Sequence, residues 1–153
     1  MTTKNLAALA MICLLCSCQK DDSLIGITGD YSYKTSGEII SFTDSDTLRV
    51  ALPDEVGTLD IVPLHENGNI LLTFNTLGGS AYSTFGTADG DDITFEPFNR
   101  TLRLGMLTYD ISVEGTARRY DGTILFSLTY EGQSQSFERK LESTSVQTIA
   151  KRN

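Results

Sequence analysis

An apolar side chain at every second position is the feature that most constrains the fold of this chain. Residues 107–114 read Leu-Thr-Tyr-Asp-Ile-Ser-Val-Glu, and residues 70–75 and 123–130 alternate in the same way. This period of two predicts antiparallel β-strands with one face in a core and the other in water. Weaker strand candidates are residues 30–35, 47–52, 58–63, 81–86, 92–96 and 135–142. No stretch after Gly29 has a helical period, so the chain is predicted to be all-β.

Glycine beside an acidic or amide residue marks the breaks between these strands. The predicted turns are Glu66-Asn67-Gly68-Asn69, Asp89-Gly90-Asp91, Tyr120-Asp121-Gly122 and Glu131-Gly132. Glycine there supplies the positive φ that tight hairpins need. The expected fold is therefore an antiparallel up-and-down meander of about 8–10 strands. A closed barrel would hide the sheet edges, and a two-layer β-sandwich is the alternative.

The N-terminus reads as an export signal. Lys4 precedes an apolar run over residues 6–15, which is shorter than the roughly 20 residues that a membrane-spanning helix needs. The run closes with Leu15-Cys16-Ser17-Cys18, which resembles the lipobox of bacterial lipoproteins. The resemblance implies removal of residues 1–17 and acylation of Cys18. Several acyl chains on one residue would hold the protein stably at a membrane.

The four residues after Cys18 are Gln19, Lys20, Asp21 and Asp22. They resemble the surface-export signal of Bacteroidetes lipoproteins, which implies an outer-membrane protein displayed at the cell surface. Retention facing the periplasm is the alternative. The expected organisation is a signal peptide over 1–17, an acylated tether over 18–28, one β domain over 29–145 and a C-terminal tail over 146–153.

Charge and cysteine content exclude several classes of function. The chain carries 20 acidic and 12 basic residues, a formal net charge of −8 at pH 7, which disfavours nucleic acid as a partner. All 3 cysteines lie at or before residue 18. The folded domain is therefore expected to have no disulfide, no thiol catalysis and no cysteine metal site.

The lipobox, the tether, Gly29-Asp30-Tyr31 and the meander together look like the calycin-like, or lipocalin-like, lipoproteins of Bacteroidetes. In lipocalins a Gly-x-Trp opens the first strand and an arginine of the last strand lies across the ring. Here Tyr31 stands in the place of that tryptophan. Arg139 shares a face with Phe137 and Leu141, so it is expected either to cover the Tyr31 ring or to extend to the barrel rim.

Catalytic and metal motifs are weak. His65 is the single histidine and precedes a turn, and Gly78-Gly79-Ser80-Ala81 lacks the spacing of a nucleophile elbow. We therefore expect that the protein is not an enzyme and binds no cofactor. The acidic runs at 44–46 and 89–92 could offer oxygen ligands to calcium, but neither continues as an EF-hand, so no metal site is predicted. Ser23 and Thr47 resemble the O-glycosylation sites of Bacteroidetes exported proteins.

Binding is the remaining class of function. One hypothesis places a small apolar or amphipathic ligand in the barrel, among inward-facing side chains. The candidates for this lumen are Tyr31, Tyr33, Phe74, Phe95, Tyr109, Phe126, Tyr130 and Arg139. The alternative is a filled core with recognition of a protein or glycan by loop 76–87, where Tyr82 and Phe85 lie among Gly and Ser. A connected internal cavity would distinguish the two.

Overall fold

The computed structural model describes residues 24–64 and 67–153. The expectations for Cys18, Gln19, Lys20, Asp21, Asp22, Ser23 and His65 lie outside these residues. Within the described ranges, no helix is long and apolar enough to cross a membrane.

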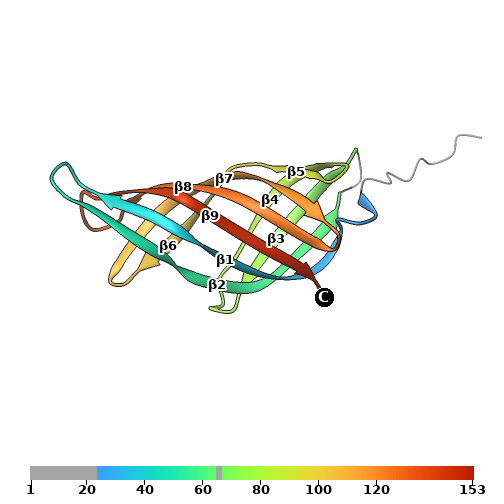
Figure 1. Ribbon diagram of the computed structural model, residues 1–153, viewed down its shortest axis with the longest axis horizontal. Coiled ribbons are helices and arrows are strands. Elements are labelled where there is room, and N and C mark those ends of the chain that lie inside the picture. Colours follow the sequence, from blue (N-terminus) through green and yellow to red (C-terminus); the bar gives the residue numbers. More distant parts are fainter. Residues whose placement is uncertain (1–23, 65–66) are drawn as a thin grey trace, which may run out of the picture.

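In the part of the chain that the structure describes, nine β-strands make up a single antiparallel sheet, which confirms the all-β prediction (Figure 1). They are β1 (Gly29–Phe42), β2 (Thr47–Pro63), β3 (Asn69–Thr76), β4 (Ala81–Asp89), β5 (Asp92–Phe95), β6 (Phe98–Leu104), β7 (Leu107–Tyr120), β8 (Thr123–Ser134) and β9 (Lys140–Arg152). The order is β5-β4-β3-β2-β1-β9-β8-β7-β6, so the first and last strands pair. Strands that follow one another in sequence pair with each other, as in an up-and-down meander, except for β5 and β6, which do not pair.

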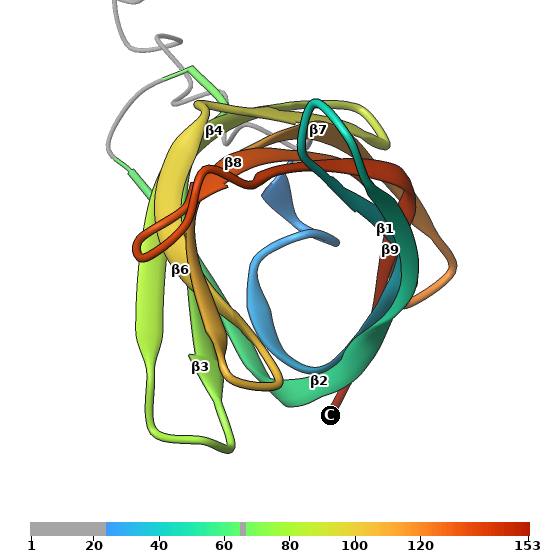
Figure 2. The same ribbon diagram turned by 90° about the vertical axis from the view of Figure 1, so that its left-hand side faces the viewer.

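A further pairing between β5 and β7 closes the sheet into a ring (Figure 2). The ring differs between its two halves. In the half next to residue 24, β3, β4 and β5 complete the circle between β2 and β7. In the other half, β6 pairs with β7 alone, and residues 47–56 of β2 pair with β1 alone among the described strands. We call these the closed half and the open half.

Strand β2 corrects the prediction of two strands over 47–52 and 58–63. Glu55 pairs with Thr35, but Leu52 pairs with Gly37, so β2 carries one extra residue at this point. The extra residue of this β-bulge shifts the alternation of inward and outward side chains along β2 by one position. As a result Leu52 and Glu55, three positions apart, both point into the barrel, where Leu52 joins the core and Glu55 meets Tyr33.

The ends of the domain also differ from expectation. Residues 146–152 were predicted to be a tail, but they belong to β9 and pair with both β1 and β8. At the other terminus, residues 24–28 form a turn instead of a free tether, and Ile27 is fully buried in the core. The apolar positions of both segments are covered by the barrel, and this burial is what orders them.

Three of the predicted turns have the expected glycine with positive φ: Gly68 at 74°, Gly90 at 62° and Gly122 at 78°. In two of them the preceding residue also has a positive φ, 53° at Asn67 and 40° at Asp121, as type I′ hairpins require. The predicted turn at Glu131-Gly132 is wrong, because both residues lie inside β8. A Cβ on Gly132 would stand 2.4 Å from the carbonyl oxygen of Asp110, so this glycine permits close approach of two strands.

Inward side chains form two hydrophobic cores. The closed-half core contains Ile27, Tyr31, Tyr33, Leu59, Ile61, Ile70, Leu72, Phe74, Ala88, Ile93, Ala117, Ile124, Phe126 and Ala150. The open-half core contains Ile39, Leu52, Leu102, Tyr109, Ile111, Val113, Tyr130, Leu141 and Val146. Leu128 packs against both.

Candidate functional site

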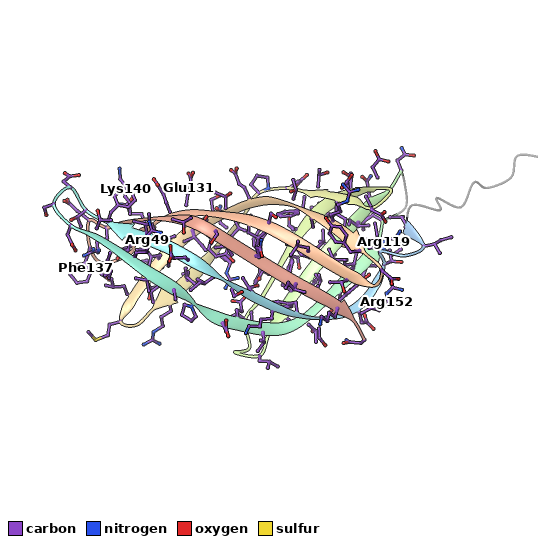
Figure 3. The ribbon with its side chains drawn as sticks, viewed as in Figure 1. Arg49, Arg119, Glu131, Phe137, Lys140 and Arg152 are labelled. Atoms are coloured by element: carbon purple, nitrogen blue, oxygen red, sulfur yellow. The ribbon has the colours of Figure 1, made fainter. Side chains whose placement is uncertain are left out.

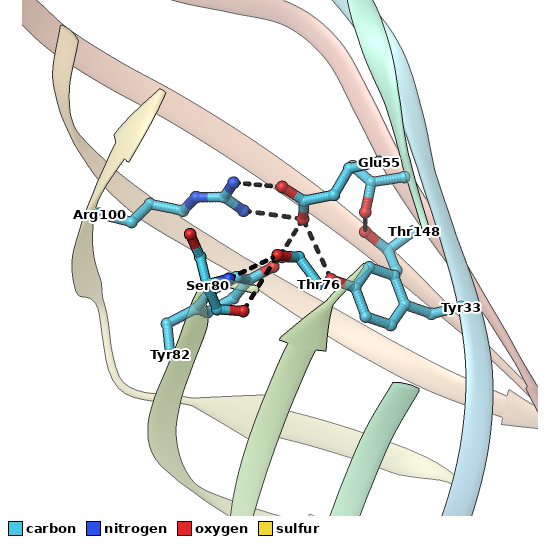
Figure 4. A network of polar contacts seen from close by, with 8 residues as sticks. Tyr33, Glu55, Thr76, Ser80, Tyr82, Arg100 and Thr148 are labelled. Atoms are coloured by element: carbon cyan, nitrogen blue, oxygen red, sulfur yellow. Dashed lines mark hydrogen bonds and ion pairs between the residues drawn. The ribbon is translucent and has the colours of Figure 1, made fainter. Parts of the chain in front are cut away.

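A charged network lies at the junction of the two halves (Figure 4). The Arg100 guanidinium binds the Glu55 carboxylate with two hydrogen bonds: Nη1 donates to Oε1 at 3.0 Å, and Nη2 donates to Oε2. The hydroxyls of Tyr33 and Tyr82 also donate to Oε1, at 3.2 and 3.0 Å. The side chains of Arg100 and Glu55 are only 12% and 21% exposed, so this is a largely buried ion pair. Such a pair is stable only when its polar atoms are satisfied.

Tyr82 connects this network to an aromatic stack. Its ring lies between those of Phe74 and Phe98, with centroids 5.0 and 5.2 Å away and nearly parallel planes. The Arg100 guanidinium carbon lies 4.5 Å from the centroid of the same ring, within cation–π range. Tyr82 was predicted to be an exposed recognition residue of a loop. It is instead a partly buried residue of β4 that faces inward.

The electrostatics keep each group of the network in one protonation state. Burial alone would raise the pKa of Glu55, but the hydrogen bonds and charge of Arg100 outweigh it and lower that pKa. Burial raises the pKa of Tyr82 and of Tyr33, and it raises that of Tyr130 to about 12. Glu55 is therefore an ionised acceptor, and Tyr33 and Tyr82 are neutral donors to it. The arrangement is suited to holding strands together.

We expect this network to make the protein sensitive to acid. A carboxylate whose pKa is lower in the folded than in the unfolded chain contributes stability above its unfolded pKa and loses it as pH falls through the folded value. The free energy of unfolding should therefore fall as pH drops below about 4.5, the ordinary pKa of Glu55. Urea denaturation between pH 3 and 7 measures this. The variant Glu55→Gln should have a flatter acid limb, and an unchanged limb would contradict the assignment.

A second candidate site is an open pocket at the end of the barrel remote from residue 24. It has a volume of about 820 Å³. Its lining comes from the turn between β1 and β2, the turn between β8 and β9 and the start of β7. The two turns lie at the same end of the barrel, on the left in Figure 1. Its lining residues are Thr43, Asp44, Ser45, Leu107, Gln133, Phe137, Glu138, Arg139 and Lys140. We call this pocket the cup.

One wall of the cup is braced by Arg139. Its Nη2 donates to Asp46 Oδ2 at 2.8 Å, and its Nε donates to Ser41 Oγ at 3.1 Å. Ser41 in turn is hydrogen-bonded to the Tyr109 hydroxyl at 2.8 Å, which joins the wall to the open-half core. Beside it, Phe137 is 61% exposed. The cup thus presents a free aromatic ring next to a fixed cation.

Figure 3 places the cup relative to the rest of the barrel. Phe137 and Lys140 lie at one end, and Arg119 and Arg152 lie at the other end, next to residue 24. Strand β1 runs between these ends with 14 residues, a length of about 45 Å at roughly 3.3 Å per residue.

The predicted lumen aromatics mostly face inward, as expected. Tyr31, Tyr33, Phe74, Tyr109, Phe126 and Tyr130 are at most 5% exposed, and Phe95 is partly buried. They pack on one another: Phe74 meets the rings of Tyr33 and Phe126 edge-on at 5.4 and 5.6 Å. Among the described residues, every buried side-chain nitrogen and oxygen has a hydrogen-bond partner. These side chains belong to the two hydrophobic cores.

Arg139 does not cover Tyr31. It lies in the turn before β9, at the cup end, whereas Tyr31 is at the opposite end. The arginine over the Tyr31 ring is Arg152 of β9, with its guanidinium carbon 5.3 Å from the ring centroid. Arg152 also donates to the carbonyl oxygens of Gly26 and Thr28, at 2.7 and 3.0 Å. These hydrogen bonds hold the N-terminal turn, residues 24–28, against the barrel.

The other predicted positions lie on the outside. Phe85 is 55% exposed on β4 and lines a groove of about 540 Å³ with Leu64, Phe95 and Pro97. Thr47 is exposed at the start of β2. The acidic runs considered for calcium pair with arginines: Asp46 with Arg139, Asp91 with Arg119 and Asp92 with Arg118. No group of three metal-ligating side chains occurs in the described ranges.

Sequence reasoning missed Glu55 and Arg100. Glu55 falls between two segments that were read as separate strands, and β6 was not predicted. One signal was available, because Phe98, Arg100, Leu102 and Leu104 alternate with polar residues and place an arginine at an inward position. Comparison with protein-family models and with curated proteins finds no match to this chain.

Proposed function

We propose that this protein is a lipid-anchored, non-catalytic binding module that holds a small amphipathic ligand in the cup. The observation that carries the proposal is the open pocket of about 820 Å³ between the hairpin turns, where an exposed Phe137 lies beside the braced Arg139. Pockets for small ligands usually measure about 300–1,000 Å³ and combine apolar surface with a few polar groups.

The packing of the interior favours the cup over the lumen. A ligand in the closed half would have to displace aromatic rings that already contact one another. Close-packed interiors resist such insertion, because displaced side chains lose their contacts and leave their rotamer minima. The cup requires no such displacement, since Phe137 is already exposed.

The lining chemistry suggests an amphipathic ligand. Among the lining residues, Phe137 and Leu107 offer apolar contact, Arg139 and Lys140 offer positive charge, and Asp44 and Glu138 offer negative charge. Arg139 is held by Asp46 and Ser41, so a ligand that contacts it would not have to order that side chain. Such preorganisation reduces the entropic cost of binding.

The anchoring part of the proposal follows from the N-terminal sequence. Acylation at Cys18 would tether the chain, and residues 19–22 would direct it to the cell surface, with the periplasmic face as the alternative. The cup would then face away from the membrane, because it lies at the far end of β1 from residue 24. The acidic net charge would disfavour nucleic acid as a partner.

A binding experiment tests the site with two matched phenylalanines. The full chain is purified from its own membranes, and native mass spectrometry reports any acyl mass on Cys18 and any carried ligand. The amphipathic dye 1-anilinonaphthalene-8-sulfonate then serves as a probe of the cup. We expect Phe137→Ala to weaken dye binding about tenfold or more, since central aromatic contacts often carry over 1 kcal/mol.

The control is Phe85→Ala, which removes a similarly exposed ring from the outer groove. It should leave dye binding and the carried mass unchanged. If Phe85→Ala weakens binding and Phe137→Ala does not, the recognition surface is the β4–β5 groove. If neither variant has an effect and no ligand is carried, the cup proposal is wrong.

A further inference from the structure

The open half of the barrel has a seam between β2 and β6. Residues 47–56 of β2 and all of β6 each use one edge for pairing, with β1 and with β7. Their other edges flank a pocket of about 340 Å³, which is lined by both strands and by the β3–β4 turn. Every other strand of the open half is paired on both edges along this core.

Glu55 and Arg100 join the two sides of this seam. Among the described residues, theirs are the only hydrogen bonds and the only ion pair between residues 47–56 and β6. Elsewhere around the ring, neighbouring strands are joined by ladders of backbone hydrogen bonds. At this boundary a side-chain ion pair therefore joins the two strands, whereas backbone hydrogen bonds join the strands at the other boundaries.

The two strands beside the seam cover part of the open-half core. Leu52 comes to this core from β2 and Leu102 from β6, and Phe98 and Leu104 of β6 pack against it. Strand β6 is connected at one end through Glu96 and Pro97, which are exposed, and at the other through a turn at Gly105 and Met106. At the start of this strand, the Glu96 N–H donates to the carbonyl oxygen of Phe85 at 2.8 Å, and Phe98 stacks on Tyr82. Because only one edge of β6 is paired, the rest of the strand has fewer backbone partners than its neighbours.

We propose that β6 is a gate and that the Glu55–Arg100 pair is its latch. When the latch releases, β6 moves away from β2 while the closed half keeps its structure, and the apolar interior around Leu52 and Leu102 becomes accessible through the seam. Local opening of this kind occurs where a segment has few backbone partners, and it does not require global unfolding. The gate is a property of the chain itself and does not depend on what the cup binds.

Hydrogen exchange of the full chain, read by mass spectrometry, tests the gate. The variant Glu55→Gln/Arg100→Gln removes both charges, so neither side chain is left as a buried uncompensated ion. We expect amides of residues 98–104 to exchange about tenfold or more faster than in the unmodified protein. Residues 146–151 of β9, which pair on both edges, should keep their rate.

A matched control removes an ion pair that also joins two strands. Asp92→Asn/Arg118→Gln neutralises an exposed pair between β5 and β7, whose backbones are already hydrogen-bonded. It should leave exchange of residues 98–104 unchanged. Should the first double variant fail to fold, Arg100→Lys keeps the charge but loses the two-pronged geometry, and it should accelerate the same segment by a smaller factor.

Two outcomes would overturn the proposal. If the amides of β6 and β9 exchanged faster by the same factor, the ion pair would stabilise the whole fold and not β6 in particular. Unchanged exchange of residues 98–104 in both seam variants would show that apolar contacts alone hold β6 closed.

Discussion

Replacing Arg100 by alanine is expected to lower the free energy of unfolding by about 3–5 kcal/mol, the usual cost of removing one partner of a buried ion pair. The Glu55 side chain is only 21% exposed beside Arg100, and the substitution leaves its carboxylate with two tyrosine hydroxyls and no cation. It also removes the guanidinium from the Tyr82 ring, which loses its cation–π contact. Urea denaturation at pH 7, followed by circular dichroism, measures the change.

The matched control is Arg49→Ala. Arg49 also pairs with a glutamate, Glu38, but the two side chains are 63% and 40% exposed. Exposed pairs contribute about 0–1 kcal/mol, so this variant should remain close to the unmodified protein. Equal effects of the two substitutions would contradict the structural role of the buried pair. The double variant Glu55→Gln/Arg100→Gln should be more stable than Arg100→Ala, because it leaves no uncompensated charge.

Replacing Gly57 by alanine should also destabilise the fold strongly, by about 3 kcal/mol. Gly57 is the residue at which β2 begins to pair with β3, opposite Thr76. A Cβ there would stand 2.0 Å from the carbonyl oxygen of Asn75 and 3.0 Å from the Cα of Thr76. Both are backbone atoms of β3, so relief requires that β3 move away and weaken its ladder.

The adjacent turn supplies the control for this prediction. A Cβ on Gly78 would meet only the Thr76 hydroxyl, at 3.7 Å. Gly78→Ala should therefore change the free energy of unfolding by no more than about 0.5 kcal/mol, as substitutions away from packed features usually do. Thermal and urea denaturation of the two variants give the comparison. A Gly57→Ala variant as stable as Gly78→Ala would mean that β2 and β3 are not so closely apposed.

Patterns of a few consecutive residues predicted the parts of the fold that depend on neighbouring residues. The alternation over residues 107–114 placed Tyr109 and Ile111 in the core, where they are almost fully buried. The Asn67-Gly68 turn follows from the positive φ that these two residues tolerate better than others. Each of these features is decided by the chemistry of a few consecutive side chains, so it can be read before the chain is folded.

Features that join distant segments could not be read in this way. Arg139 and Arg152 both sit near the C-terminus, and only the register of β9 against β1 brings Arg152, and not Arg139, onto Tyr31. Gly132 looked like a turn residue, but Asp110 of the facing strand is what requires a glycine there. In both cases the decisive partner lies more than ten positions away in the chain.

A period of two and glycine-containing turns are local properties, so the residues alone predict an antiparallel meander with aromatic residues inside. Which strands remain unpaired at the seam, and which side chains join them, depends on the tertiary structure. The bulge in β2 turns Glu55 inward only because Gly37 and Thr35 of β1 set the register, and Arg100 reaches it only because β6 lies across the open half. Pairing between strands, and not the residues of any one strand, places these charges together.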